Sequence, residues 1–495
     1  MKRLSLLAVL CLSATGLFAA QGDLRWAGDS EGGAPFIYQD PADPSKLVGA
    51  EVEMMALVAR ELGLKPVFVQ NMWEGLIPGL DRGDYDVAVN AIEITPERSK
   101  QVAFSRPYFI TYEQLAVRRD DTSIETLDQL KGKRVGTYSG ALAQGLLEER
   151  GLKPLLYDTI DPLYRDLGLK RLDAVLLDQP IALYVGKPLP DVKFVGPPVG
   201  RLEYGMAFLK KNAALRDKVN AALQRLEASG ELRQLWERWG LWNSSMQRSP
   251  RDSGPSVQAS TWDAYLAGRS AKESWGVRAQ RYAFEFTPLL ARGALVTLGL
   301  SVLGMALAMV LGLGLSLGRL YGPWWIRWPS LAYIEAIRGT PLLIQLFILF
   351  YGLPHFGLKL PPFVAAILGL GLNYAAYEAE NYRAGLLAVP VGQMEAALTL
   401  GLSRAQALRH VLIPQAWRNI LPPVTNDFVS ILKDSSLVSV ITMVELTKVY
   451  GQLAATYYDW LGLGLLTAAM YFLVGLPFVM LARWAEKRLH PDRPR

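Results

Sequence analysis

The sequence predicts a multidomain protein in which an α/β soluble domain is followed by an all-α transmembrane bundle of about five helices. Its 495 residues exceed the size of one ordinary domain. Hydrophobic residues make up 51% and charged residues 20% of the chain, an average between a soluble and a membrane-embedded protein. The average conceals two halves, because residues 23–290 mix charged and apolar residues whereas long uncharged runs begin only after Arg292. The composition therefore predicts a soluble front half and a membrane-embedded back half.

The N-terminus has the pattern of a secretory signal peptide or an N-terminal anchor, over residues 1–21. Lys2 and Arg3 supply the positive charge, and Leu4–Phe18 supplies the apolar stretch that follows it. Both alternatives predict that the chain from residue 23 onward is exported. Cys11, within this stretch, is the only cysteine, which excludes a disulfide within the chain.

Short strands and helices alternate in the exported half. Glu53–Leu62 has the apolar spacing of a helix, and Val67–Val69 is a short strand. Gly75–Asp81 is then a second helix and Asp86–Val89 a second strand. This alternation predicts an α/β domain with its ligand site at the carboxyl ends of the strands.

A series of short motifs runs through residues 22–243. In order along the chain they are Ala34–Phe36, Leu47–Val52, Trp73–Leu80, Ile94–Arg98, Phe104–Tyr108, Leu130–Gly136, Leu172–Val175 and Asp178. This ordered set resembles the family 3 periplasmic amino-acid-binding proteins. The resemblance implies a two-lobed periplasmic-binding-protein fold of type II, with lobe 1 at about 22–111 and 200–243 and lobe 2 at about 112–199.

The resemblance also implies an amino-acid site between the lobes. Arg98 would bind the ligand's carboxylate, because a planar guanidinium offers two parallel donors, and Asp178 would bind the ammonium group. Trp73 would pack against the ligand's side chain or hold a cation. The residues expected at the site are Phe36, Trp73, Glu93, Arg98, Gly140, Ala141 and Asp178.

Three positions depart from the family's pattern. Glu93 stands where the family usually has Ser or Thr, Ser139–Leu142 lacks a frequent Thr, and Gly33 replaces an aromatic residue. Backbone N–H groups at the helix start near Ala141 could still bind a carboxylate. A second anion in the pocket, from Glu31 or Glu93, favours a cationic ligand such as arginine or lysine. The alternative is that these two side chains point elsewhere.

Residues 244–285 are expected to link the two halves. Ser244–Ser245 and Ser249–Ser256 are polar and rich in turn-forming residues. Trp262–Phe284 is amphipathic, which predicts a short segment at the membrane interface.

Five runs after residue 285 are long enough to cross a bilayer. They are Gly293–Gly318, Gly339–Leu358, Leu360–Tyr377, Leu421–Val444 and Trp460–Ala482, of which only the fourth contains Asp or Lys. With the front half exported, five spans place the arginine-rich connections and the C-terminal tail on the cytoplasmic side, as the positive-inside rule requires. The bundle is predicted to occupy residues 286–489, and residues 490–495 to form a tail.

The connection between the third and fourth predicted spans, residues 390–415, carries Glu395-Ala396-Ala397-Leu398-Thr399-Leu400-Gly401 and then Val411–Pro414. Further motifs are Arg338–Leu343, Ala376–Glu380, Pro390–Gln393 and Leu432–Leu437. Residues 287–489 thus resemble the permeases of ABC importers, in the subfamily that takes up histidine, glutamine or arginine, where this connection is the EAA loop.

The resemblance implies that the EAA loop projects from the bundle and seats on an ATP-binding subunit. The residues expected to couple the permease to that subunit are Glu395, Ala396, Ala397 and Gly401, with Gly401 permitting the turn after the short helix. Charged residues near membrane depth are candidates for the translocation path, namely Glu380, Lys433 and Asp434. Pairing of Lys433 with Asp434 is the alternative.

Other functions are disfavoured by what the sequence lacks. No Gly-x-x-x-x-Gly-Lys-Ser/Thr loop occurs, so ATP hydrolysis is expected on a separate subunit and the chain is not expected to be an enzyme. The three histidines are scattered without metal-ligand spacing, and neither a metal nor a cofactor is expected. The net charge of +6 is mild and no Lys/Arg run suits nucleic acid.

The sequence and its resemblances together predict the membrane permease subunit, with a fused solute-binding domain, of an ATP-driven importer of polar amino acids. The expected location is the bacterial inner membrane, with the binding domain outside and the EAA loop and C-terminus in the cytoplasm. The expected partners are an ATP-binding subunit, a second copy of the permease in a homodimer, a polar or cationic amino acid and the lipid bilayer. The alternative is a ligand-gated channel or a membrane-tethered amino-acid receptor, which would use the same binding fold.

Overall fold

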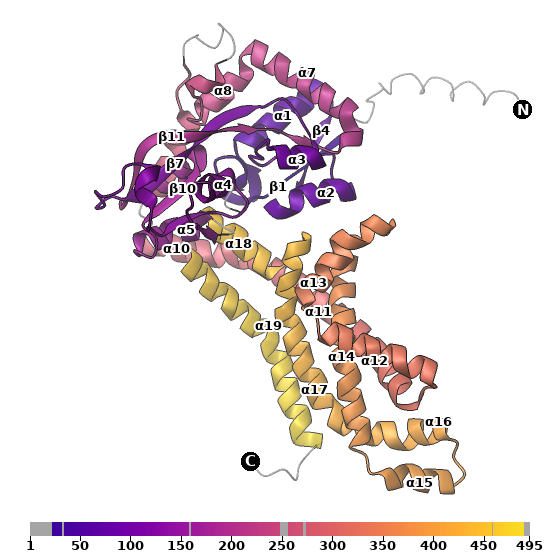
Figure 1. The fold of residues 1–495 in the computed structure, drawn as a ribbon. Helices are drawn as coiled ribbons and strands as arrows, with labels where there is room; N and C mark the ends of the chain where they lie inside the picture. Colours follow the sequence, from indigo (N-terminus) through magenta and orange to yellow (C-terminus); the bar gives the residue numbers. More distant parts are fainter. Residues whose placement is uncertain are drawn as a thin grey trace, which may run out of the picture.

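The computed structural model describes residues 22–31, 34–157, 160–247, 256–270, 274–457 and 459–489. An α/β body, coloured indigo to magenta in Figure 1, stands on one end of a bundle of helices coloured orange to yellow. The predicted signal or anchor segment, Gly33 and the predicted tail lie outside the described residues.

Lobe 1 of the α/β body is a five-stranded sheet with helices on both faces. Its strands, in the order β4-β1-β5-β12-β6, are Lys65–Gln70, Asp23–Gly28, Val87–Ala88, Ala207–Phe208 and Ala103–Phe104. β1 pairs in parallel with β4 and β5, while β12 pairs antiparallel with β5 and β6. Helices α1 (Ala50–Leu62), α7 (Ala213–Ser229) and α8 (Glu231–Arg238) bury apolar residues with Leu24 and Trp26 in one core, and α2 (Leu76–Arg82) packs with Ala27 and Ala88 in another.

Lobe 2 is a second five-stranded sheet. Its strands, in the order β11-β7-β10-β8-β9, are Val192–Tyr204, Phe109–Arg118, Ala174–Asp178, Val135–Tyr138 and Leu155–Tyr157. Helix α5 (Ile160–Gly168) packs in one core of this lobe and α4 (Leu142–Glu148) in the other. Strand β7 begins at lobe 1 and strand β11 ends there. These two long antiparallel strands therefore join the two lobes.

Two short helices follow the α/β body, α9 (Ser260–Ser270) and α10 (Trp275–Arg281). The Trp262 ring lies 4.2 Å from the Tyr184 ring, measured between centroids, and Tyr265 contacts Tyr38 at 6.2 Å. Trp262 was predicted to belong to a segment at the membrane interface, but it packs on the α/β body instead. The reason is that an aromatic face already lies there to receive it, which the amphipathic pattern alone does not reveal.

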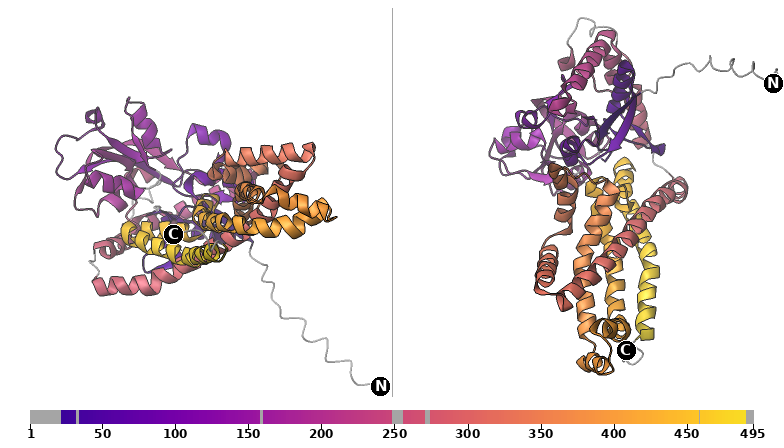
Figure 2. Two further views of the ribbon diagram at one scale, coloured as in Figure 1. Left: turned by 90° about the horizontal axis from the view of Figure 1, so that it is seen from below. Right: turned by 90° about the vertical axis from the view of Figure 1, so that its right-hand side faces the viewer.

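Long helices run along the bundle (Figures 1 and 2). They are α11 (Thr287–Tyr321), α12 (Trp324–Arg338) with α13 (Leu342–Phe347), α14 (Pro362–Leu387), α17 (Ile413–Asp434) and α19 (Trp460–Leu489). By length and apolar composition, two helical stretches among the described residues can cross a membrane, Trp275–Tyr321 and Trp460–Leu481. A third is added if α12 and the arm Leu342–Phe356, which meet at an angle of 108°, count as one span.

The predicted second span, Gly339–Leu358, is not one straight helix. Its helical part begins only after the sharp bend, and α12 precedes the bend. Pro341 explains the break, because it lacks an N–H donor and keeps the residue before it out of the helical conformation. α14 covers most of the predicted third span, whereas α17 covers only residues 421–434 of the predicted fourth span, Leu421–Val444. Both helices carry acidic residues among their apolar ones.

Glycine allows the two central helices of the bundle to approach closely. A Cβ on Gly312 of α11 would lie 2.7 Å from Glu378 Cβ and 3.0 Å from the Ala375 carbonyl oxygen of α14. Two residues further along, on the other side of α11, a Cβ on Gly314 would meet no atom within 4 Å. Small residues at one face therefore set the spacing of α11 and α14.

Candidate functional site

A cavity between the two lobes brings the sequence-predicted site residues together. Its lining residues are Asp29, Glu31, Phe36, Trp73, Asn90, Ala91, Glu93, Tyr138, Ala141, Ile160, Leu177, Asp178 and Ile181. Five of these were expected at the site, namely Phe36, Trp73, Glu93, Ala141 and Asp178. The other two expected residues meet across the lobes beside the cavity, where Arg98 Nη2 donates to the Gly140 carbonyl oxygen at 3.2 Å.

The start of helix α3 (Pro96–Gln101) positions Arg98. Thr95 caps this helix, because its hydroxyl accepts a hydrogen bond from the Arg98 backbone N–H at 3.2 Å. The Arg98 guanidinium lies 4.8 Å from the centre of the Trp73 ring and forms an ion pair with Glu93. Arg98 is therefore held in the cleft by an aromatic face on one side and a carboxylate on another.

Glu93 occupies the position that the sequence predicted for a ligand's carboxylate. Besides its ion pair with Arg98, its Oε1 accepts from the Leu142 backbone N–H, at 3.4 Å, at the start of helix α4. These are the guanidinium and the helix-start N–H groups that were expected to bind a carboxylate. The chain thus supplies its own carboxylate to these donors.

Asp178 ends strand β10 and is buried. It accepts a hydrogen bond from the Tyr204 hydroxyl. Burial raises the pKa of Asp178 to about 7, and the nearby charge of Glu93 acts in the same direction. Glu113 lies fully buried close to both, and burial, followed by the charges of Asp178 and Glu93, raises its pKa well above the usual value. The site is therefore short of positive charge.

Asp29 extends the acidic side of the cavity and was not among the predicted residues. Its Oδ1 accepts from Gln70 Nε2 at 2.9 Å and from the Glu31 backbone N–H at 3.0 Å, and its Oδ2 accepts from the Trp73 backbone N–H at 3.2 Å. Asp29 directly follows strand β1. The rule that ligands bind at the carboxyl ends of parallel strands would have identified it.

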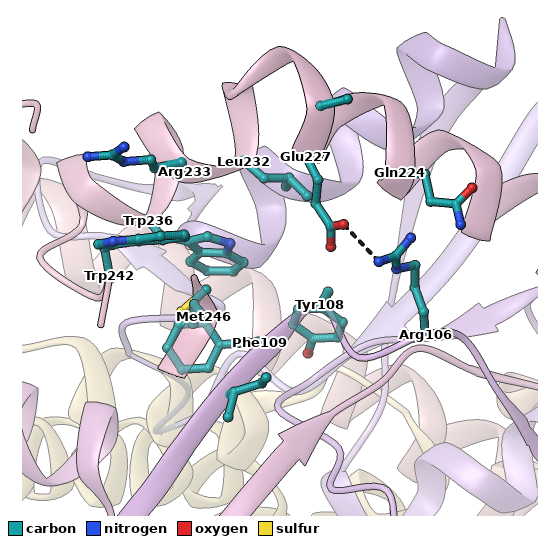
Figure 3. A pocket seen from close by; sticks show the side chains of 12 residues that line it. Arg106, Tyr108, Phe109, Gln224, Glu227, Leu232, Arg233, Trp236, Trp242 and Met246 are labelled. Atoms are coloured by element: carbon teal, nitrogen blue, oxygen red, sulfur yellow. Dashed lines mark ion pairs between the residues drawn. The ribbon is translucent and has the colours of Figure 1, made fainter. Parts of the chain in front are cut away.

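A second cavity, of about 250 Å³, is shown in Figure 3. Its walls come from α7, from α8 with Trp242 and Met246 after it, and from residues 106–110, where the chain enters β7. Its carboxylate, Glu227, already forms an ion pair with Arg106 at 2.9 Å. The sequence-predicted residues all lie outside this cavity.

Two contacts between the α/β body and the bundle involve a buried basic side chain. At one, Arg82 of α2 is buried, donates to the Leu360 carbonyl oxygen at 2.8 Å and covers the Phe350 ring at 3.6 Å. At the other, Lys448 of helix α18 (Leu446–Tyr457) pairs with Glu31 at 2.8 Å. The second contact joins the bundle to a residue of the between-lobe cavity.

The predicted EAA loop lies at the end of the bundle opposite the α/β body (Figure 1). It contains α15 (Val391–Thr399) and α16 (Arg404–Ala407). Ala397 is buried, whereas Glu395 and Ala396 are exposed. Gly401, just after α15, has a φ of 83°, a conformation that favours glycine.

The residues predicted for the translocation path do not form one cluster. Glu380 forms ion pairs with Arg319 and, at 2.8 Å, with Arg383. Asp434 accepts a hydrogen bond from the Tyr374 hydroxyl at 2.6 Å, while Lys433 is exposed. The alternative pairing of Lys433 with Asp434 does not occur among the ion pairs of the described residues.

A two-lobed α/β body with a cleft between its lobes, fused to a bundle of membrane-spanning length, defines a transport protein that carries its own solute-binding domain. Residues 26–241 match the family described as bacterial extracellular solute-binding proteins, family 3. Residues 304–491 match the family described as the binding-protein-dependent transport system inner membrane component. The chain belongs to this inner membrane family and carries a family 3 solute-binding domain in front of its permease domain.

Curated relatives match the permease domain over most of their own length. The L-cystine transport system permease protein TcyB of Bacillus subtilis is 38% identical over 205 residues, which are 41% of this chain and 88% of that protein. The glutamine transport system permease protein GlnP of Escherichia coli is 37% identical over 204 residues, 41% of this chain and 93% of that protein. The octopine transport system permease protein OccM of Rhizobium radiobacter is 39% identical over 218 residues, 41% of this chain and 89% of that protein.

The front domain has relatives among solved structures. An ancestral arginine-binding protein bound to glutamine is 33% identical, covering 45% of this chain and 99% of that chain, with a TM-score of 0.42. The family matches identify this chain as a multi-pass inner-membrane permease subunit with a fused solute-binding domain. They favour the transport function over the alternative of a ligand-gated channel or a tethered receptor.

Proposed function

We propose that this chain is the permease subunit of an ATP-driven importer of cationic amino acids. The observation that carries the choice of cargo is the acidity of the between-lobe cavity. Four carboxylate residues line it, Asp29, Glu31, Glu93 and Asp178. Buried carboxylates require positive partners, and a ligand that brings an ammonium and a basic side chain supplies them. The names of the permease relatives, which include amino-acid transport systems, support the choice of an amino acid.

Each site residue has a role in this proposal. Asp178 binds the α-ammonium group, and Arg98 with the α4 start binds the α-carboxylate after Glu93 has moved aside or rotated. Phe36 and Trp73 flank the ligand's aliphatic stem, and Gly140 and Ala141 keep the opposite wall short. Glu31 and Asp29 then face the basic end of the side chain. An acidic ligand would add a negative charge to a site that is already poor in positive charge.

The bundle supplies the passage and the contact to the motor. A separate ATP-binding subunit would dock on α15 and α16, where Glu395, Ala396 and Gly401 lie on the end distant from the binding domain. Two copies of the permease would enclose the path, with Glu380, Lys433 and Asp434 near it. The binding domain would then be extracytoplasmic, and the EAA loop and the C-terminus cytoplasmic, in agreement with the positive-inside rule.

Ligand binding to the purified full-length chain in lipid nanodiscs tests this function. We expect calorimetry to show binding of arginine or lysine and weaker or no binding of glutamate. Arg98→Ala and Asp178→Asn should each weaken arginine binding strongly, because each leaves a charge of the bound ligand without its partner. Glu227→Gln, in the cavity of Figure 3, is the matched control and should bind like the wild type. Tighter binding of glutamate than of arginine would contradict the proposed cargo.

A further inference from the structure

The contact between α18 and the binding domain reaches the ligand cavity itself. Lys448 Nζ lies 2.8 Å from Glu31 Oε1 and 3.9 Å from Asp29 Oδ1. Glu31 and Asp29 both line the between-lobe cavity. α18 lies directly below the α/β body in Figure 1. A lysine of the permease domain is thus paired with two acids of the solute-binding site.

The surroundings of Lys448 show that this is a close and enclosed contact. The Lys448 side chain is only 4% exposed. One turn further along α18, a Cβ on Gly451 would lie 3.1 Å from the Glu31 carboxylate, so that the carboxylate packs directly on the helix backbone. Gln452 Nε2 also donates to the Ser30 hydroxyl at 3.4 Å. The loop that carries Asp29 and Glu31 is therefore seated on α18.

The charges around Glu31 and Asp29 show what Lys448 contributes to this end of the cavity. Burial raises the pKa of Glu31 to about 7, and the ammonium of Lys448 acts in the opposite direction by favouring the ionised form. The Asp29 carboxylate accepts hydrogen bonds from the Gln70 side chain and from the Trp73 backbone N–H, which stabilise it. The cation that neutralises this end of the cavity therefore comes from the permease domain.

From these contacts we propose that Lys448 competes with the basic side chain of the ligand for Glu31 and Asp29, and so drives release of the ligand when the binding domain is seated on α18. The inference rests on the proposed function, because it requires a cationic ligand. Lysine and a cationic ligand present the same chemistry, a positive group on a flexible aliphatic stem. Lys448 already occupies the position beside both carboxylates, so the basic group of a ligand that approached them would meet the positive charge of Lys448 there. Seating the domain therefore lowers the affinity for cationic ligands and leaves the sites for the α-ammonium and α-carboxylate groups unchanged.

Two variants test the competition in the full-length chain in nanodiscs. Lys448→Gln removes the competing charge, and arginine binding should tighten roughly tenfold or more, the lower end of the coupling between close charges at interfaces. Gly451→Ala keeps every charge but pushes the Glu31 carboxylate away from the α18 backbone by a few tenths of an ångström, and it should also tighten arginine binding, by less than Lys448→Gln does. Because alanine suits a helix interior better than glycine, this second variant remains informative if Lys448→Gln fails to fold.

Two controls separate competition from a merely structural ion pair. Lys448→Arg keeps the positive charge at this position and should therefore show no gain in arginine affinity over the wild type. Gln452→Ala removes a neighbouring contact of the same helix without touching the acids, and it should leave arginine binding unchanged. Adding Glu31→Gln to Lys448→Gln should cancel the gain, because the carboxylate that the ligand would use is then absent.

The measurement is calorimetric titration of each variant with arginine and with norvaline, a neutral amino acid that shares the α-groups but lacks the basic end. Tighter arginine binding with unchanged norvaline binding in Lys448→Gln and Gly451→Ala would support the proposal. Equal changes for both ligands, or no change for arginine in either folded variant, would overturn it. If the wild type binds neither arginine nor lysine, the proposed function itself fails. That result differs from arginine binding whose affinity is the same in the wild type and in Lys448→Gln, which would contradict only the competition.

Discussion

The pH dependence of arginine binding follows from the burial of Asp178. Its pKa is raised to about 7 in the ligand-free site, chiefly by burial. A bound ammonium lowers this pKa again, because an opposite charge favours the ionised form. The ligand therefore binds the ionised form of Asp178, and where Asp178 is protonated, binding releases its proton. Its affinity must rise as the pH increases through 7 and level off above about pH 8.

The size of the effect can be worked from the same value. With a pKa of about 7, roughly one Asp178 in eleven is ionised at pH 6 and roughly ten in eleven at pH 8, so the affinity should rise about tenfold over this interval. A single group limits the slope to tenfold per pH unit in the acidic range. A steeper slope would indicate that a second carboxylate, such as Glu31, must also lose its proton.

Calorimetric titration of the full-length chain with arginine, in buffers of different ionisation enthalpy, measures both the affinity and the proton released. Asp178→Asn should bind arginine much more weakly and with a smaller rise between pH 6 and 8. Glu227→Gln, outside the between-lobe cavity, should reproduce the wild-type profile. A wild-type affinity that does not change across this interval would refute the reasoning, as would a variant that keeps the wild-type slope.

Three further predictions concern stability and coupling. Burial raises the pKa of Glu51 to about 7, above its value in the unfolded chain, so its protonated form stabilises the fold at low pH and this stability is lost as the pH rises through 7. Glu51→Gln, whose side-chain oxygen can still accept from the Ala91 backbone N–H, should reduce that loss and raise the melting temperature at pH 8 by a few degrees. Gly312→Leu should destabilise the bundle by about 1–3 kcal/mol or more through overpacking against α14, whereas Gly314→Leu should not; thermal denaturation in detergent compares the two. Gly401→Ala places a side chain on a residue with a φ of 83°, at a cost of about 1 kcal/mol, and should reduce ligand-stimulated ATP hydrolysis by the assembled transporter. Gly392→Ala is the control and should not reduce it, so equal activity of the two variants would contradict a role for the turn.

Much of the fold could be predicted because its signals are local. The uncharged runs around Gly293–Gly318 and Trp460–Ala482 lie within α11 and α19, since a bilayer-length apolar stretch needs no knowledge of its neighbours. The bend before Leu342 was missed although Pro341 signals it, because the uncharged run was read as one helix. Trp262 was misplaced for a different reason, since its partner Tyr184 belongs to a distant part of the chain.

The candidate site was predicted as a set of residues but not as a network. Motif positions brought Trp73, Arg98 and Asp178 to one cleft, as the structure has them. The pairing of Arg98 with Glu93 depends on side-chain orientation in a closed cleft, which no spacing reveals. The approach of Lys448 to Glu31 depends on how two domains pack, and nothing in either local sequence indicates it.

The placement of Trp262 and Tyr265 on the α/β body has a consequence for how strongly the two domains need to bind each other. These rings fasten the start of the linker to the domain, and α10 leads directly into α11, so the binding domain remains close to its docking surface. Docking is then an intramolecular event, and short connections give effective concentrations in the millimolar range. The interface that includes the Arg82 and Lys448 contacts can therefore be well occupied without a large contribution from each single contact. A domain tethered in this way cannot diffuse away from its permease when it leaves the docking surface.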